Sequence, residues 1–232
     1  GKMPETIEGT LRCIEARGHS CRGTTLTRVD WTQGLGVKTL AEAGEGVEVL
    51  FWVGCAAALE ERNTKVAIAF AKILQAAGVN FAILGDEETC CGEPARRIGN
   101  EYLFQNQAQQ NIEVLRTHGV KKIVATCPHC FNTIKNEYPQ FGGEFEVVHH
   151  TELIVELLRA GRLKLTNGID KTITYHDGCY LGRHNDIYEA PREVVQSIPQ
   201  SRCVEMERHH DRSFCCGGGG GRIWMDTPKG ER

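Results

Sequence analysis

Along the chain, short apolar runs alternate with longer amphipathic stretches. A run such as V-E-V-L-F-W-V at 47–53 is too short to be a membrane helix and is typical of a buried strand. Glycine or polar residues follow each run, as expected where a strand passes into a loop. The pattern predicts three strands in the first half of the chain, at residues 47–53, 80–84 and 121–126.

The segments between these strands have the period of α-helices. In residues 61–77 the apolar side chains recur at the spacing of one helix face, and Gly78 follows as a cap. Residues 94–118 predict a second helix, because Pro94 suits a first turn and Gly119 follows the last apolar position. The order strand, helix, strand, helix, strand predicts a parallel sheet with helices across it, an α/β fold made of Rossmann-like βαβ units.

The rest of the chain repeats this arrangement incompletely. A short helix, a strand and a helix are followed by a second unit of strand, helix and strand, and the chain stops before the next helix. These elements are expected at residues 131–138, 145–148, 149–158, 172–175, 191–198 and 203–206. We divide the chain into an irregular extension at 1–45 with a helix in 4–17, a first unit at 46–165 and a truncated second unit at 166–232.

Composition excludes several classes of protein. The formal charge is −3 and no run of Lys or Arg exceeds a pair, which argues against a nucleic-acid partner. No stretch approaches the ~18 apolar residues of a membrane helix, so membrane contact is expected only through segments outside this chain or through a partner. The chain lacks a start methionine and a signal peptide, and we interpret it as part of a longer cytoplasmic polypeptide.

Eleven cysteines, an odd number in a chain long enough to need no disulfides, change this picture most. In the first unit 34 residues separate Cys55 from Cys90, 35 separate Cys91 from Cys127, and Cys130 completes a C-P-H-C. Each group follows a predicted strand, and the carboxyl ends of parallel strands meet at one edge of a sheet. We therefore predict that these five sulfurs form one site.

Three further cysteines repeat part of this pattern. In the second unit 35 residues separate Cys179 from Cys215, and Cys216 is followed by five glycines at 217–221. A second C-x-x-C is missing, so the predicted second site is unfinished. It is either lost, completed by residues outside this chain, or filled by another metal.

Five thiolates at one place favour an iron–sulfur centre. Zinc takes four ligands and rarely uses adjacent cysteines, whereas thiolates are the usual ligands of iron–sulfur clusters. Cys127 opens a helix, whose dipole favours a thiolate. Arg96 and Arg97 are expected to compensate negative charge at the first site and Arg222 at the second, unless these arginines are solvated or salt-bridged.

The remaining cysteines lie outside the repeated pattern. Cys13 and Cys21 are spaced by eight positions, which fits no common cluster motif, and we interpret both as ordinary buried or free thiols. Cys203 is interpreted as a core thiol in a strand.

Several histidines lie near the motifs. His176 or His184 could replace a cysteine at the second site, as in Rieske centres, although hydrogen bonding within loops is the simpler interpretation. His129, inside C-P-H-C, is expected to tune the thiolates. Two pairs either cap helices or face solvent, or else bind metal or donate protons: His149-His150 and His209-His210.

The cysteine pattern, taken with several local strings, resembles a known family. The form C-x34-C-C-G-x34-C-x-x-C is similar to the cysteine-rich CCG domain found in the B-type and D-type subunits of heterodisulfide reductase and in their relatives. The local strings resemble more closely the membrane-linked iron–sulfur oxidoreductases associated with electron-transfer flavoprotein and fatty-acid oxidation. These strings are V-E-V-L-F-W-V-G-C at 47–55, P-A-R-R at 94–97, C-P-H-C-F-N-T at 127–133, Y-L-G-R-H-N at 180–185 and G-G-G-R-I-W-M at 219–225.

The resemblance implies an iron–sulfur oxidoreductase. Electrons would pass from a flavoprotein dehydrogenase, an electron-transfer flavoprotein or a ferredoxin, together with other iron–sulfur subunits or domains, to a quinone or a disulfide. The relatives' membrane helices and ferredoxin-like module would place the protein at the inner face of the cell membrane. For a first [4Fe-4S] cluster, cubane or non-cubane, the implied ligands are Cys55, Cys90, Cys91, Cys127 and Cys130; for part of a second they are Cys179, Cys215 and Cys216.

Two other functions stay open. The motifs could bind zinc or a cubane cluster structurally, with catalysis in a partner subunit. C-P-H-C between a strand and a helix is also the form of a thiol–disulfide oxidoreductase, although a dithiol needs only two sulfurs. No catalytic acid or base can be assigned, and the sequence contains no phosphate loop or dinucleotide fingerprint.

Overall fold

The predicted parallel sheet is present in the computed structural model, which describes residues 3–225. Four strands pair in parallel in the order β2-β1-β3-β4, so the fold is α/β as expected. The strands are shorter than the apolar runs that predicted them, since the ends of each run turn into loops. Their bounds are Val49–Trp52 (β1), Phe81–Ala82 (β2), Lys122–Ala125 (β3) and Glu146–His149 (β4).

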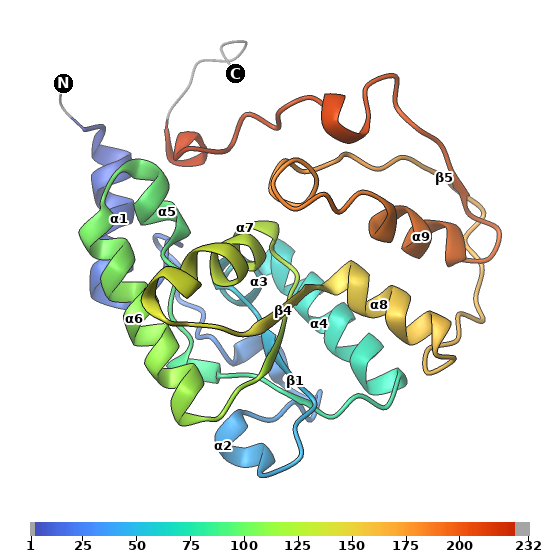
Figure 1. Ribbon diagram of the computed structural model, residues 1–232, viewed down its shortest axis with the longest axis horizontal. Helices are drawn as coiled ribbons and strands as arrows, with labels where there is room; N and C mark the ends of the chain where they lie inside the picture. Colours follow the sequence, from blue (N-terminus) through green and yellow to red (C-terminus); the bar gives the residue numbers. More distant parts are fainter. Residues whose placement is uncertain (1–2, 226–232) are drawn as a thin grey trace.

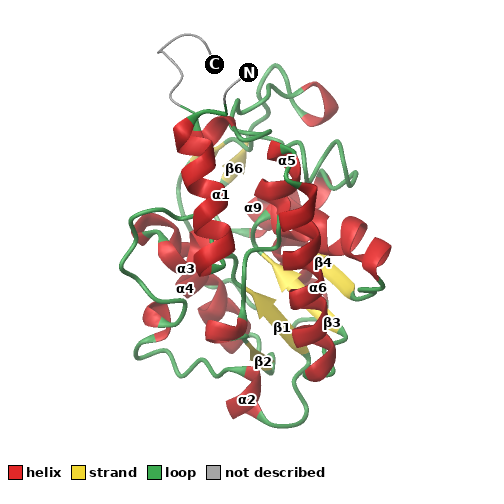
Figure 2. Ribbon diagram, turned by 90° about the vertical axis from the view of Figure 1, so that its left-hand side faces the viewer, coloured by secondary structure: helices red, strands yellow, loops and turns green. Residues whose placement is uncertain are grey.

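Helices cover both faces of this sheet (Figures 1 and 2). Alternate residues of β1 point to opposite sides, so Leu50 and Trp52 pack on α1, α5 and α6, whereas Val49 and Phe51 pack on α3, α4 and α8. The helices are α1 (Glu5–Arg17), α2 (Leu40–Ala43), α3 (Cys55–Leu59), α4 (Glu61–Ala76), α5 (Glu93–Ile98), α6 (Glu101–Thr117), α7 (Pro128–Asn132), α8 (His150–Arg159) and α9 (Glu189–Ser197).

The single helix predicted at 94–118 is wrong, because two helices occupy this stretch. Gly99 ends α5 in the left-handed region at φ 94°, and Asn100 caps α6 by accepting a hydrogen bond from the backbone N–H of Leu103 at 3.0 Å. The apolar period continues across the break and hides it. The helix predicted at 131–138 starts earlier, in α7. It continues as a π-helical segment at Thr133–Glu137 and a 3-10 turn at Tyr138–Phe141.

A smaller parallel pair forms the second sheet. β5 (Thr172–Ile173) and β6 (Arg202–Cys203) flank α9, which confirms the predicted order strand, helix, strand. Cys203 is only half-buried, so its assignment to a core was wrong: a sheet of two short strands cannot cover it. A buried ion pair links two segments of this unit, with Arg192 of α9 donating to both carboxylate oxygens of Asp177 at 2.7 and 2.8 Å.

His149 and His150 lie where β4 passes into α8. His149 is 2% exposed and caps α8, which is one of the roles expected for this pair. Its Nε2 lies 3.2 Å from Nδ1 of His150. Phe131 packs edge-on against the ring of His149 and Phe70 against that of His150, which is only partly exposed. Burial lowers the pKa of His149 to about 3 and that of His150 to about 4.

We expect this pair to make the fold sensitive to acid. The unfolded chain takes up protons on both rings near pH 6.5 and the folded chain does not, so the free energy of unfolding decreases as the pH falls from about 6.5 towards 4. Urea unfolding at pH 7.0 and 5.0 measures the loss. The double substitution His149→Gln/His150→Gln should flatten the dependence, and an unchanged slope in that variant would contradict the assignment.

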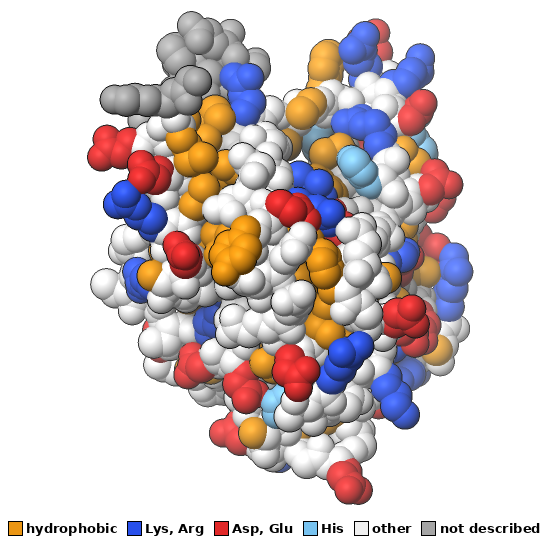
Figure 3. All heavy atoms as spheres, turned by 60° about the vertical axis from the view of Figure 1, so that its left-hand side comes forward, with side chains coloured by type: hydrophobic (Ala, Val, Ile, Leu, Met, Phe, Trp, Pro, Cys, Tyr) orange, Lys and Arg blue, Asp and Glu red, His pale blue; other side chains and the backbone are white. Residues whose placement is uncertain are grey.

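The described part of the chain contains no helix that is long and apolar enough to cross a bilayer. On the face shown in Figure 3, acidic and basic side chains are interspersed rather than gathered into one basic region.

Candidate metal centre

The three cysteine groups of the first unit all lie at the carboxyl edge of the four-stranded sheet. Cys55 follows β1 and is the first residue of α3, after Gly54 has turned the chain at φ 79°. Cys127 follows β3, the strand that pairs with β1 on the side opposite β2. The connections leave β1 and β3 in opposite directions, and the crevice between two such strands is where parallel sheets bind ligands.

The adjacent pair Cys90 and Cys91 lies between β2 and α5. Gly92 follows at φ 86°, and its backbone N–H donates to Cys90 Sγ at 3.5 Å. Asn111 of α6 holds the same turn by donating to the Cys90 carbonyl at 2.9 Å, and Tyr138 donates to the Cys91 carbonyl at 3.2 Å. The turn that carries the two cysteines is thereby held by α6 and by the segment around Tyr138.

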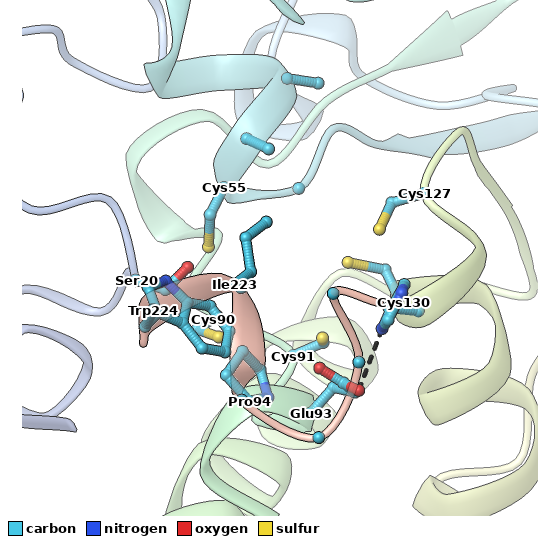
Figure 4. A pocket seen from close by; sticks show the side chains of 18 of the residues that line it. Ser20, Cys55, Cys90, Cys91, Glu93, Pro94, Cys127, Cys130, Ile223 and Trp224 are labelled. Carbon is cyan, nitrogen blue, oxygen red and sulfur yellow. Dashed lines mark hydrogen bonds and ion pairs between the residues drawn. The ribbon is translucent and has the colours of Figure 1, made fainter. Parts of the chain in front are cut away.

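All five sulfurs line one cavity of about 240 Å³ and point into it (Figure 4). A single water needs only about 10–15 Å³ of such space, so the cavity has room for a larger group. Hydrogen bonds between neighbouring thiols connect the five in the order Cys55, Cys90, Cys91, Cys130, Cys127. The predicted convergence of three distant segments is therefore present.

The thiols differ in their tendency to lose a proton. Hydrogen bonds from Cys130 lower the pKa of Cys127 to about 6 and that of Cys91 to about 7. The hydrogen bond to Cys90, together with burial, raises the pKa of Cys55 well above its usual value. Buried thiols that share protons in this way become fully anionic only when a positive charge enters the cavity.

Arg28 supplies positive charge at Cys55, a role that no pattern in the sequence indicated. Its guanidinium donates to Cys55 Sγ at 3.4 Å and pairs with the buried Glu88 at 2.8 Å. In the described part of the chain, neither Arg96 nor Arg97 donates a hydrogen bond to a cysteine sulfur. They form ion pairs with Glu137.

His129 and Glu93 contribute polar side chains to the cavity wall. His129 of the C-P-H-C donates from Nδ1 to Glu93 Oε1 at 3.0 Å, and the hydroxyl of Tyr180 donates to the same oxygen at 3.1 Å. Burial opposes it, but the hydrogen bond to Glu93 raises the pKa of His129. Tyr180 belongs to the second unit and stacks on His184 at 4.8 Å between ring centres, so His184 has a structural contact.

The second cysteine group lies in two adjoining segments. His176 donates from Nε2 to the Phe214 carbonyl at 2.8 Å, and the Ser213 hydroxyl donates to the Asp177 carbonyl at 2.8 Å. These two hydrogen bonds join the segment before Cys179 to the segment before Cys215. Cys215 and Cys216 are exposed, and Cys179 is half-buried.

Cys216 reaches the first cavity, which the sequence did not indicate. It contributes to the cavity wall together with Gly218–Gly221, Ile223 and Trp224, and its charge is close enough to raise the pKa of His129. Figure 1 shows this late segment returning beside α1 and α5. The second motif thus helps to enclose the first site.

His209 and His210 form a cluster with Glu205, in which one ligand atom from each lies within 4.8 Å of the others. Glu205 also accepts two hydrogen bonds from Arg192, at 2.7 and 3.0 Å, so its carboxylate is already paired with a cation. Cys13 and Cys21 stay outside the cavity wall. Cys13 Sγ lies 3.6 Å from Nδ1 of His19, and Cys21 Sγ lies 3.8 Å from a Glu60 oxygen.

A comparison with protein families matches two stretches of the chain to the cysteine-rich domain called CCG, at residues 49–135 and 173–232. The chain belongs to the CCG cysteine-rich domain family. The two matched stretches contain both C-C-G motifs, Cys90-Cys91-Gly92 and Cys215-Cys216-Gly217. In this CCG chain, the first motif lies in the cavity, and the second contributes Cys216 to its wall.

Curated proteins similar to this CCG chain carry redox names. The probable iron-sulfur-binding oxidoreductase FadF of Bacillus subtilis is 44% identical over the whole chain and 34% of its own length. The EtfAB:quinone oxidoreductase of Syntrophomonas wolfei is 44% identical over 86% of the chain and 28% of its own length. One subunit of the dihydromethanophenazine:CoB--CoM heterodisulfide reductase of Methanosarcina mazei is 39% identical over 75% of the chain and 44% of its own length.

The CCG chain therefore spans between 28% and 44% of the length of these three relatives. A comparison with solved structures found no match.

Proposed function

We propose that this chain is the electron-transfer part of an iron–sulfur oxidoreductase. It would pass electrons from a flavoprotein such as an electron-transfer flavoprotein, or from a ferredoxin, to a quinone or a disulfide at the cytoplasmic face of the membrane. The observation that carries this proposal is the convergence of five cysteine sulfurs on one cavity. Relatives named for quinone and heterodisulfide reduction support the two classes of acceptor.

The residues around the cavity fit an iron–sulfur cluster. Cys55, Cys90, Cys91, Cys127 and Cys130 supply sulfur donors, more than the four that a zinc ion takes. Arg28 and the backbone N–H groups at Gly92, His129 and Cys130 offset negative charge on the thiolates. When bound, a cluster would accept and release electrons one at a time. Each side chain named here would hold it or adjust its potential.

A second, partial site belongs to the same proposal. Cys179, Cys215 and Cys216 would supply part of its ligands, and we place the boundary between the two units near residue 165. The exposure of Cys215 and Cys216 supports this assignment, because thiols that await further ligands need not be enclosed.

A thiol–disulfide function has one observation in its favour. In C-P-H-C the pKa of Cys127 is about 6 and that of Cys130 is raised, as expected for an attacking and a buried thiol. Against it, Cys130 also shares a hydrogen bond with Cys91, so the two sulfurs are members of a larger group.

Anaerobic purification followed by iron and acid-labile sulfide analysis tests the proposal. We expect a brown protein with about four irons and four sulfides at the first site, reducible by dithionite with a change in its EPR spectrum. A colourless protein with one zinc per chain would instead support a structural role. A metal-free protein whose Cys127 is rapidly alkylated would support the dithiol.

A further inference from the structure

The amino-terminal segment, which lies outside the matched CCG stretches, makes direct contact with the first site. The Gly18 carbonyl accepts a hydrogen bond from the backbone N–H of Cys90 at 2.6 Å and another from Nη2 of Arg28 at 2.9 Å. One carbonyl therefore ties a cysteine segment to the Arg28 side chain. The family match begins only at residue 49.

Arg28 and Glu88 form a buried pair with a definite orientation. Their side chains are 9% and 2% exposed. The guanidinium donates from Nη2 to Cys55 Sγ at 3.4 Å, whereas the carboxylate accepts from the backbone N–H groups of Val53 and Gly54 at 2.9 and 2.8 Å. The pair is neutral as a whole, but its positive end lies on a sulfur.

Stability alone does not account for this pair. Burying two charges costs about as much free energy as their attraction returns, so such a pair is weak evidence for a stabilising role. Its geometry serves the site instead. Glu88 fixes the turn that begins with Gly54, and Arg28 fixes the sulfur that follows.

We infer that Arg28 is a positioning residue of the first site, which orients Cys55 and raises the reduction potential of the cluster bound there. This inference rests on the proposed function. Reduction adds negative charge to a cluster and its thiolates. A guanidinium N–H donated to one sulfur therefore stabilises the reduced form more than the oxidised form.

The test is a redox titration of the holoprotein with dithionite, followed by EPR. Arg28→Met alone leaves the Glu88 carboxylate buried without its cation, so the informative variant is Arg28→Met/Glu88→Gln, in which the side chain is neutral and its amide oxygen can still accept from one of the two backbone N–H groups. We expect the ratio of reduced to oxidised cluster at a fixed ambient potential to fall about tenfold, which is about 59 mV for one electron.

Arg96→Met is the matched control, because Arg96 follows Cys91 in α5 and is paired with Glu137. It removes a positive charge near the site but no hydrogen bond to a sulfur. An equal shift in Arg96→Met, or an unchanged potential in the double variant at normal iron content, would overturn the inference alone. Wild-type protein without iron and sulfide would overturn both the inference and the proposed function.

Discussion

Cys91→Ala is expected to abolish iron binding at the first site. Cys91 is 4% exposed and occupies the middle of the row of sulfurs, where it shares hydrogen bonds with Cys90 and Cys130. Its removal divides the five sulfurs into two pairs, Cys55 with Cys90 and Cys127 with Cys130, and takes away the ligand that lies between them. Iron and sulfide content after anaerobic purification or reconstitution measures the effect.

The fold should survive this change. Losing one sulfur from a cavity wall costs about 1 kcal/mol, a small part of the stability of a domain. Cys203→Ala is the matched control, since Cys203 lies in β6 and outside the cavity wall. Equal iron content in the two variants, with equal urea midpoints, would show that Cys91 is not a ligand.

Gly92→Val is expected to destabilise the protein by about 2–5 kcal/mol and to lower its iron content. A Cβ at residue 92 would lie 2.7 Å from Cδ2 of Phe104 and 3.2 Å from its carbonyl oxygen. Phe104 is fully buried and cannot move aside. The left-handed backbone at φ 86° adds a further cost for a β-branched residue, so Cys90 and Cys91 must shift.

Gly99→Val separates the two causes. Gly99 has a similar φ of 94° but nothing within 4 Å of a Cβ, so this variant carries the backbone cost of about 1–2 kcal/mol without the clash. Urea unfolding gives both free energies, and iron analysis shows whether the site follows. If Gly99→Val were as damaging as Gly92→Val, the packing against Phe104 would not be the reason for the glycine in this C-C-G.

Local patterns predicted the elements that repeat a clear period. The strands at 47–53 and 121–126 and the helix at 61–77 were found because each has either a continuous apolar run or one apolar face. The break at Gly99 was missed, since apolar residues continue at helical spacing on both sides of it.

The candidate site was predictable to the extent that its cysteines recur at similar spacing, each group after a predicted strand. Five cysteines after three strands could be brought together by the rule for parallel sheets alone. Arg28 could not, because it lies in a segment without period and its partner Glu88 is 60 residues further on. Cys216 in the wall of the first cavity depends on how the second unit packs, which no local spacing encodes.

The wall formed by Cys216, Gly218–Gly221, Ile223 and Trp224 has a consequence for the order in which the site is built. A ribosome has made all five cysteines of the first group once it reaches residue 130, but it needs roughly 94 more residues, up to Trp224, before this wall is complete. At about 5–20 residues per second, that leaves an interval of about 5–19 s. During this interval the cavity lacks one side, and metal or a preassembled cluster can reach the sulfurs from there. In the complete chain the glycine-rich segment forms part of the cavity wall.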